Sequence, residues 1–580
     1  MSDHKRRSRQ IVCTALAVTL VLGASVLQVE AADPLLVKDI NPGPAWSAPY
    51  QLRNVDGTLF FTANDGAIGF ELWKSDGTEA GTVLVKDIQA GPAGSGAGAV
   101  TALNSTLLLS AKGGASGFEL WKSDGTEAGT VLVKDINPGP ADSTPSELTV
   151  VNGTVFFQAN FSGIGIELWK TDGTAAGTVL VKDVNPGAAN SLPIELTDVN
   201  GTLFFRADDG LPGVGNHREL WKSDGTAAGT VMVKNIRPDP PGSDPFALTN
   251  LGGTLYFAAD DGIHGDELWK SDGTEAGTVM IKDINPGPGN GATNFYPTIM
   301  NGTLFFRADD GTIGPALWKS DGTAAGTVMI KDLDPSAYSP PIWLTNVDGT
   351  VFFAFYDDLW KSDGTTEGTV MVKDLETNYP MALEYLTDVN GALFFAANDG
   401  IHGQEVWMSD GTEAGTVLAA DANPGDEFSF SWPTGLTAVD GTLMFQAWNE
   451  SHGAELWAVA PSVAGAVPDG NAVTGTPLSV GKGTGSDITL TWDDSSCATG
   501  TTDYAIYEGV LGSFASHASM LCSTGGVTAW QITPDSEDSY YLVVPVSETM
   551  EGSYGHGSDG SERAQGAPAC GVQVLDDSCF

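Results

Sequence analysis

Hydrophobic and polar residues alternate in short runs along most of this chain, and the same runs return at regular intervals. In the stretch 71–88, ELWKSDGTEAGTVLVKDI, two runs of strand-favouring residues flank a polar turn. Asp76-Gly77 and Gly81 supply the turn, because glycine adopts a positive φ without steric cost. The stretch therefore predicts a β-hairpin.

The hairpin register follows from its polar ends. We start with Ser75 opposite Thr82, on either side of the turn. Counting outward along both strands then puts Glu71 opposite Lys86. Opposite charges facing each other across two strands stabilise a hairpin by roughly 0.2–1 kcal/mol. We expect a cross-strand ion pair of this kind in most copies of the hairpin.

Copies of the hairpin recur with the period of a blade-forming repeat. Each repeat offers four strand candidates, which in the first copy are 51–55, 58–62, 71–74 and 82–88. Four short antiparallel strands in a repeat of this length predict one blade of a β-propeller. The anchoring tryptophans follow one another at intervals of 42 to 52 residues: Trp73, Trp121, Trp169, Trp221, Trp269, Trp318, Trp360, Trp407 and Trp457.

The two ends of the array complement each other. A lone strand candidate, 35–40, precedes the first complete repeat, whereas the fourth strand is missing after Trp457. Pairing of the N-terminal strand with 455–457 would remove two unpaired sheet edges. We therefore predict an all-β protein with a propeller of about nine four-stranded blades, closed by its N-terminal strand. Fewer blades, or two unequal arrays, are the alternatives.

The repeats also carry a family resemblance. ELWKSDGT, at 71–78, 119–126 and 267–274, resembles the ELWxxDGT repeat proteins of secreted bacterial origin, over about Asp33 to Ala460. The resemblance implies export and a propeller-like β fold, and it brings no catalytic residues. The turn SDGTxxGT is also similar to the Asp-box of sialidases, where it is structural. That likeness favours the fold and says little about chemistry.

The first 31 residues have the pattern of a secretory signal peptide. Basic residues 5–7 precede an apolar run, 11–27, and a small-residue site ends at Ala31. The run is short for a membrane-spanning helix. We predict a secreted protein without a membrane span, at the cell surface or in the medium, with the periplasm as an alternative.

The pattern changes after the last repeat. Residues 461–471 are rich in proline, glycine and alanine and predict a linker between the propeller (33–460) and a second domain (472–580). The second domain resembles a fibronectin type III-like module, which implies a small β-sandwich. Four cysteines in an exported domain predict two disulfides, for which three connectivities exist. We favour the pairs Cys497–Cys522 and Cys570–Cys579.

The chain is strongly acidic, with a formal net charge of −46. Such a surface repels nucleic acid and anionic membranes, so we predict neither as a partner, and we expect a soluble monomer. Acidic loops such as Asp208-Asp209 would suit calcium, but Asp-Gly is ordinary turn sequence. We predict no cofactor and leave structural calcium as the alternative. His264, His402 and His452 share one loop position, which favours a loop-stabilising role over a zinc site.

Aromatic residues are distributed unevenly among the connections between blades. The connections that enter blades six to nine and blade one are rich in them, whereas the others nearly lack them. Trp343 and Tyr385 occupy a position that is glutamine or glutamate in other repeats, so we expect an exposed apolar patch. Such rings stack on sugars or anchor proteins; packing of loop against loop is the alternative. The candidate ligand-binding residues are Trp46, Tyr296, Trp343, Tyr385 and Trp432.

Catalytic motifs are scarce. Arg206 and Arg307 end equivalent strands, as arginines of a sialidase-like site would, but no Tyr–Glu nucleophile pair accompanies them. We predict no catalytic residues, no metal site and no enzymatic activity. The expected function is a secreted, non-enzymatic binding or surface-interaction module for a glycan or protein outside the cell. The alternatives are a glycan-processing, sialidase-like hydrolase and a purely structural cell-surface or matrix protein.

Overall fold

A computed structural model describes residues 34–211, 217–292, 295–333, 340–375, 383–425 and 429–459, together with the backbone of eight strands between 479 and 573. The predicted signal peptide and linker lie outside the described residues. The same holds for all four C-terminal cysteines, so the proposed disulfides remain predictions.

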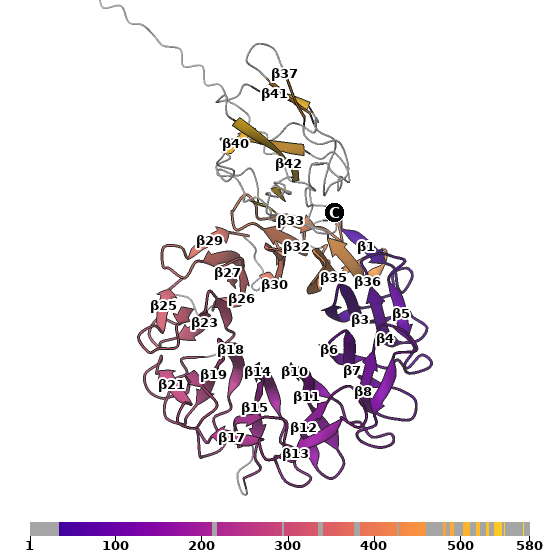
Figure 1. Cartoon of the computed structure of the whole chain (residues 1–580), viewed down its shortest axis with the longest axis vertical. Helices are drawn as coiled ribbons and strands as arrows, with labels where there is room; N and C mark the ends of the chain where they lie inside the picture. Colours follow the sequence, from indigo (N-terminus) through magenta and orange to yellow (C-terminus); the bar gives the residue numbers. More distant parts are fainter. Residues whose placement is uncertain are drawn as a thin grey trace, which may run out of the picture. The chain divides into compact units, whose positions relative to one another are not determined.

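Among the described residues, the region from Leu35 to Val459 folds into nine four-stranded antiparallel sheets arranged in a ring (Figure 1). In blade one the strands run from the centre outward as β2 (Tyr50–Val55), β3 (Thr58–Asn64), β4 (Phe70–Ser75) and β5 (Val83–Lys86). Blades two to four repeat this order with β6 (Gly98–Leu103), β7 (Thr106–Lys112), β8 (Phe118–Ser123) and β9 (Val131–Lys134); β10 (Ser146–Val151), β11 (Thr154–Phe161), β12 (Gly165–Thr171) and β13 (Val179–Lys182); and β14 (Ile194–Val199), β15 (Thr202–Asp208), β16 (Arg218–Ser223) and β17 (Val231–Lys234).

Blades five to eight keep the same order. Their strands are β18 (Phe246–Leu251), β19 (Thr254–Asp260), β20 (Asp266–Ser271) and β21 (Val279–Lys282); β22 (Thr298–Met300), β23 (Thr303–Asp309), β24 (Pro315–Ser320) and β25 (Val328–Lys331); β26 (Ile342–Val347), β27 (Thr350–Phe355), β28 (Asp358–Ser362) and β29 (Val370–Lys373); and β30 (Leu383–Val389), β31 (Ala392–Asn398), β32 (Gln404–Ser409) and β33 (Val417–Ala420).

The ninth blade combines the two ends of the array. It consists of β34 (Thr434–Val439), β35 (Thr442–Asn449), β36 (Gly453–Val459) and the N-terminal strand β1 (Leu35–Lys38). In the sheet order β1-β36-β35-β34, Leu36 lies opposite Trp457. The innermost strands β34 and β2 lie next to each other, so blade nine adjoins blade one. The blade count and the strand exchange agree with the sequence prediction.

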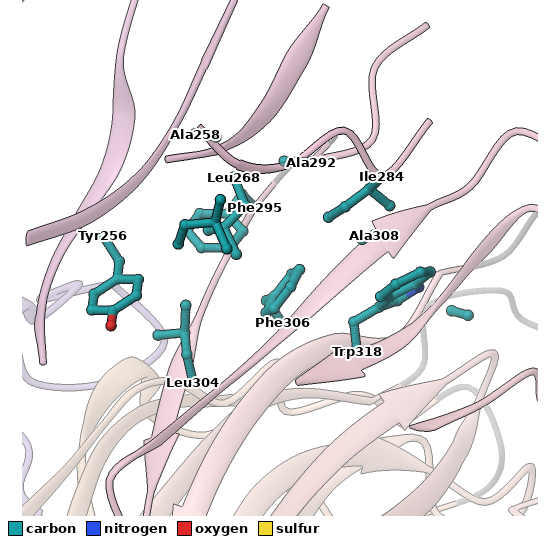
Figure 2. Packing of buried hydrophobic residues seen from close by; sticks show 12 residues of the cluster. Tyr256, Ala258, Leu268, Ile284, Ala292, Phe295, Leu304, Phe306, Ala308 and Trp318 are labelled. Carbon is teal, nitrogen blue, oxygen red and sulfur yellow. The ribbon is translucent and has the colours of Figure 1, made fainter. Parts of the chain in front are cut away.

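The hydrophobic core lies between neighbouring blades. In the cluster of Figure 2, Tyr256 and Leu268 of blade five pack against Leu304, Phe306 and Trp318 of blade six. Phe295, from the connection that enters blade six, packs edge-to-face on Phe306 with ring centroids 5.2 Å apart. The second strand of each blade is buried on both faces, and each large apolar side chain in it contributes roughly 1.5–3 kcal/mol.

The predicted ion pair between Glu71 and Lys86 is wrong. Ser75 does meet Thr82, with their hydroxyl oxygens 2.7 Å apart. The pairing then shifts by one residue at Leu72, which places Lys86 opposite Leu72. Glu71 is buried, and Lys86 donates instead from Nζ to a backbone carbonyl of blade two, 2.8 Å away.

In seven of the nine blades a buried glutamate of the motif holds the connection to the next blade; blade six has Ala316 and blade seven Asp358 at this position. Glu119 Oε2 accepts hydrogen bonds from the N–H of Ile136 (2.7 Å) and the hydroxyl of Ser143 (2.6 Å), while Oε1 accepts from the N–H of Ser143 (3.2 Å). Burial raises the pKa of these carboxyl groups, against the lowering effect of the hydrogen bonds. The pKa reaches about 7 for Glu167, Glu267 and Glu455 and about 8 for Glu405.

In blade nine the same contacts join the two ends of the array. Glu455 accepts hydrogen bonds from the N–H of Ile40 (3.0 Å) and from the N–H (3.1 Å) and hydroxyl (2.6 Å) of Ser47. Glu455 therefore fixes the segment that follows β1, more than 400 residues earlier in the chain.

Two further sheets follow the propeller in sequence. One has the order β37 (Ser479–Lys482), β38 (Ile488–Thr491), β41 (Ala529–Ile532). The other has the order β40 (Ala518–Leu521), β39 (Asp503–Val510), β42 (Ser539–Ser547), β43 (Met550–Glu551), β44 (Val572–Gln573). These strands are consistent with an all-β second domain; the loops of the predicted sandwich lie outside the described residues. Within the described ranges, no helix has the length and apolar character needed to cross a membrane.

Candidate functional site at the channel mouth

The innermost strands begin with a β-bulge that turns one side chain out of the sheet pattern. In blade four, pairing jumps from Ile194–Arg206 to Thr197–Phe204, and Glu195 adopts a φ of 60°. Positive φ is uncommon for residues other than glycine and marks a position held by its surroundings. The bulge residues of eight blades are Gln51, Ala99, Glu147, Glu195, Ala247, Trp343, Tyr385 and Gly435. The described pairing of blade six has no bulge, and the repeat alignment gives Tyr296 at the equivalent position.

A threonine two residues further on stabilises the bulge in several blades. Thr345 donates its hydroxyl hydrogen bond to the carbonyl of Trp343 (3.2 Å), and Thr387 does the same to Tyr385 (2.8 Å). Blade one carries Arg53 at this position. The same short Leu-Thr sequence thus holds side chains of very different chemistry in one backbone geometry.

Bulge side chains lean toward the next blade around the ring. Glu147 accepts a hydrogen bond from the N–H of Glu195 (3.1 Å), and the rings of Trp343 and Tyr385 lie 5.3 Å apart between centroids. The residues that directly follow the bulge, including Leu52 and Leu148, line a hollow of about 740 Å³ between the innermost strands of blades nine, one, two and three. We call the ring formed by these eight bulge residues and Tyr296 the channel mouth.

The channel mouth has chemically distinct sectors. Blades six, seven and eight present Tyr296, Trp343 and Tyr385, of which Tyr296 is 71% and Trp343 42% exposed. Blades three and four present Glu147 and Glu195, and the remaining positions carry glutamine, alanine or glycine. We call the three aromatic residues the aromatic sector. An exposed cluster of rings is a binding surface for apolar or planar groups.

Among the described residues, the ring contacts join two of the five predicted ligand-binding residues directly. Trp343 and Tyr385 contact each other, and Tyr296 takes the equivalent position in blade six. Trp432 instead stacks on Phe430, 5.7 Å between centroids, and lies 5.9 Å from Trp448.

Trp46 is also separate from the aromatic sector. It lies in the connection that enters blade one, is 61% exposed, and packs over Gly453, where a Cβ would overlap its ring. Trp46 and Trp432 therefore pack beside loops that adjoin blade nine, and their role in ligand binding stays a prediction.

Loop histidines bond within their own loops. Nδ1 of His264 lies 2.8 Å from Asp261, and Nδ1 of His402 lies 2.8 Å from Asp399. This hydrogen bond raises the pKa of His264. In the part of the chain that the structure describes, no three histidine, cysteine, aspartate or glutamate side chains are grouped to hold a metal ion.

Comparison with known proteins finds similarity in fold only. No protein-family model matches the sequence, and no curated protein matches it. Among solved structures, a puromycin-hydrolyzing peptidase from Mycobacterium tuberculosis is similar with a TM-score of 0.35 and 11% identity, over 69% of this chain and 63% of that one. Prolyl oligopeptidase B from Galerina marginata gives 0.33 and 11%, over 65% and 56%. The β-propeller domain of the Trilobed protease from Pyrococcus furiosus gives 0.30 and 10%, over 57% and 100%.

These comparisons correct the predicted function. The chain spans less than two thirds of the two complete peptidases named above, and the match is to their propeller part. The two neighbours named first are peptidases, and on that finding the prediction of a non-enzymatic binding and surface-interaction module is corrected. At this level of identity the likeness extends to the propeller fold and not to catalytic groups.

Proposed function

We propose that this propeller serves a hydrolase as the part that receives the substrate, and that the substrate is an extended polypeptide. The observation that carries the proposal is the aromatic sector: three successive blades place Tyr296, Trp343 and Tyr385 at one position of the repeat, and Tyr296 and Trp343 are exposed. The other bulge positions are acidic, neutral or small. The sector therefore offers a one-sided apolar surface at the channel mouth.

Polypeptide is the substrate class that fits the walls of this opening. The innermost strands β22, β26 and β30 pair with a neighbouring strand on one side only. On the other edge the carbonyls of Ile299 and Leu386 accept side-chain hydrogen bonds from Asn346 and Thr345, which leaves only part of that edge open to a further strand. An extended polypeptide has matching N–H and C=O groups, and its apolar side chains can pack on the aromatic sector. The acidic charge of the chain, and Glu147 and Glu195 at the mouth, oppose binding of nucleic acid.

The catalytic groups in this proposal come from a partner unit outside the described propeller. The hydrolase class is the one that the named peptidases suggest, whereas the site rests on the geometry of the channel mouth. Export through the predicted signal peptide, membership of the ELWxxDGT family, a monomeric chain and the absence of a cofactor belong to the same proposal.

The test uses the full-length protein and its double variant Trp343→Gln/Tyr385→Gln. Reduced and alkylated ribonuclease, labelled with a fluorophore, serves as the unfolded polypeptide. We expect fluorescence anisotropy to rise as the labelled polypeptide binds the wild-type protein. The dissociation constant should be at least tenfold higher for the double variant. In the cells that make this protein, replacing the gene by the double variant should lower hydrolysis of the same polypeptide severalfold. Unchanged hydrolysis, with the variant present at the wild-type level, contradicts the proposal.

A further inference from the structure

Two blades carry an arginine at the same place, and their surroundings differ. Strands β15 and β23 share the sequence Thr-Leu-Phe-Phe-Arg-Ala-Asp, which puts Arg206 and Arg307 at equivalent positions. Arg206 donates from Nη1 to Asp244 Oδ1 at 2.9 Å, and Arg218 lies 3.6 Å from the same carboxylate. In blade four the charge of the arginine is therefore compensated from the connection that enters blade five.

Blade six lacks this compensation. The repeat alignment puts Pro340 where Asp244 stands, so no carboxylate is present at that position. Among the described residues, the Arg307 side chain has no hydrogen bond or ion pair, and its Nε is buried without a partner. Burial lowers the pKa of Arg307, but a guanidinium remains protonated at neutral pH. Asp309 is the nearest carboxylate that acts on Arg307, but it makes no ion pair with the guanidinium, and a partly buried cation without a contacting partner favours an anion.

Arg307 lies near Tyr296 of the aromatic sector. In blade four, the partner of Arg206 stands three residues before the bulge residue Ala247 of the next blade. By the repeat alignment, the residue that corresponds to Asp244 for Arg307 is Pro340, three residues before Trp343. Tyr296 and Asp309 are the ionisable neighbours that act on the pKa of Arg307, so the ring of Tyr296 stands near the same guanidinium. Arg307 therefore stands near one exposed ring, Tyr296, and the neighbouring innermost strand β26 carries Trp343.

We propose that Arg307, with Tyr296 and Trp343, forms a subsite for a carboxylate that the bound ligand carries beside an aromatic or apolar group. The proposal rests on the proposed function and gives the chemistry of its substrate. The planar fork of arginine matches a carboxylate with two parallel hydrogen bonds. Glu147 and Glu195, in blades three and four, repel the same group and direct it toward blades six and seven.

Small ligands test the subsite by calorimetry on the full-length protein. N-acetylphenylalanine carries a terminal carboxylate, N-acetylphenylalanine amide carries none, and N-acetyl-aspartyl-phenylalanine amide carries a side-chain carboxylate. We expect at least one of the carboxylates to bind about 10- to 100-fold more tightly than the neutral amide. The stronger of the two identifies whether the carboxylate comes from the chain end or from a side chain.

Three variants separate the subsite from the fold. Arg307→Gln should remove the preference for the carboxylate while binding of the neutral amide persists. Pro340→Asp should also remove it, because it places a carboxylate at the position equivalent to Asp244 while keeping Arg307. Arg206→Gln is the matched control and should leave the preference unchanged, and melting temperatures confirm that each variant is folded.

Equal binding of the carboxylates and the amide overturns the inference, as does a preference that survives in both Arg307→Gln and Pro340→Asp. Failure of all three compounds to bind overturns it as well. If the unfolded polypeptide still binds at the aromatic sector in those cases, the proposed function stands. Conversely, a carboxylate preference combined with unchanged polypeptide hydrolysis in the Trp343→Gln/Tyr385→Gln cells supports the subsite and contradicts the proposed function.

Discussion

Replacing Glu455 by alanine should open the ring where its two ends meet. The carboxylate of Glu455 is buried and accepts hydrogen bonds from the N–H of Ile40 and from the N–H and hydroxyl of Ser47. Without it, two buried N–H groups lose their acceptors. Each such loss costs about 1–3 kcal/mol, so the free energy of unfolding should fall by about 2–6 kcal/mol.

Glu119→Ala is the matched control. Glu119 makes the same contacts, but with Ile136 and Ser143, which lie within 25 residues of it. Both variants should lose similar stability in urea titrations. Only Glu455→Ala should speed amide hydrogen exchange in β1, because only this variant releases the N-terminal strand from blade nine.

The measurement is hydrogen exchange followed by mass spectrometry on peptides that cover residues 34–48. Equal protection of β1 in wild-type protein and Glu455→Ala would refute the reasoning. So would faster exchange of β1 in Glu119→Ala, because the effect would then report general loosening of the propeller and not opening at its seam.

Three further predictions concern pH, the aromatic sector and the hairpin turn. Burial raises the pKa of Glu405 from an ordinary 4.5 to about 8; the folded protein therefore holds this proton more tightly than the unfolded chain. The stability that this proton contributes should be fully present below pH 4.5 and be lost as pH rises toward 8, so Glu405→Gln should make the melting temperature less dependent on pH across this range. Trp343→Gln and Tyr385→Gln should change the melting temperature by less than about 2 °C, because Trp343 is exposed; a larger loss would favour loop packing. Gly129→Ala should cost about 1–3 kcal/mol in urea titrations, because its Cβ would lie 2.0 Å from Asp124 Oδ1; wild-type stability would contradict this.

The architecture could be predicted because it repeats. Turn residues such as Asp76-Gly77 and the regular tryptophans mark each hairpin, and the unmatched strands at the two ends indicate closure. The register of the outer strands could not be predicted. A one-residue shift of the strand pairing at Leu72 buries Glu71 and turns Lys86 to the next blade. The sequence at the shift contains no glycine or proline that would indicate a bulge.

The channel mouth was visible in the sequence only in part. The unequal distribution of aromatics pointed to Trp343 and Tyr385, which do contact each other. The bulge that displays them was hidden, because tryptophan, tyrosine and glutamate are not the residues that usually mark positive φ. The contrast between Arg206 and Arg307 needs the strands in register, since it depends on Asp244 and Pro340 in neighbouring blades.

A footprint of the unfolded polypeptide on the propeller tests the central claim most directly. Hydrogen exchange of the full-length protein would be compared with and without reduced and alkylated ribonuclease. We expect added protection at the innermost strands of blades six to eight, in β22, β26 and β30 and the residues that lead into them. Protection confined to the outer strands, or no protection anywhere in the propeller, would contradict the account.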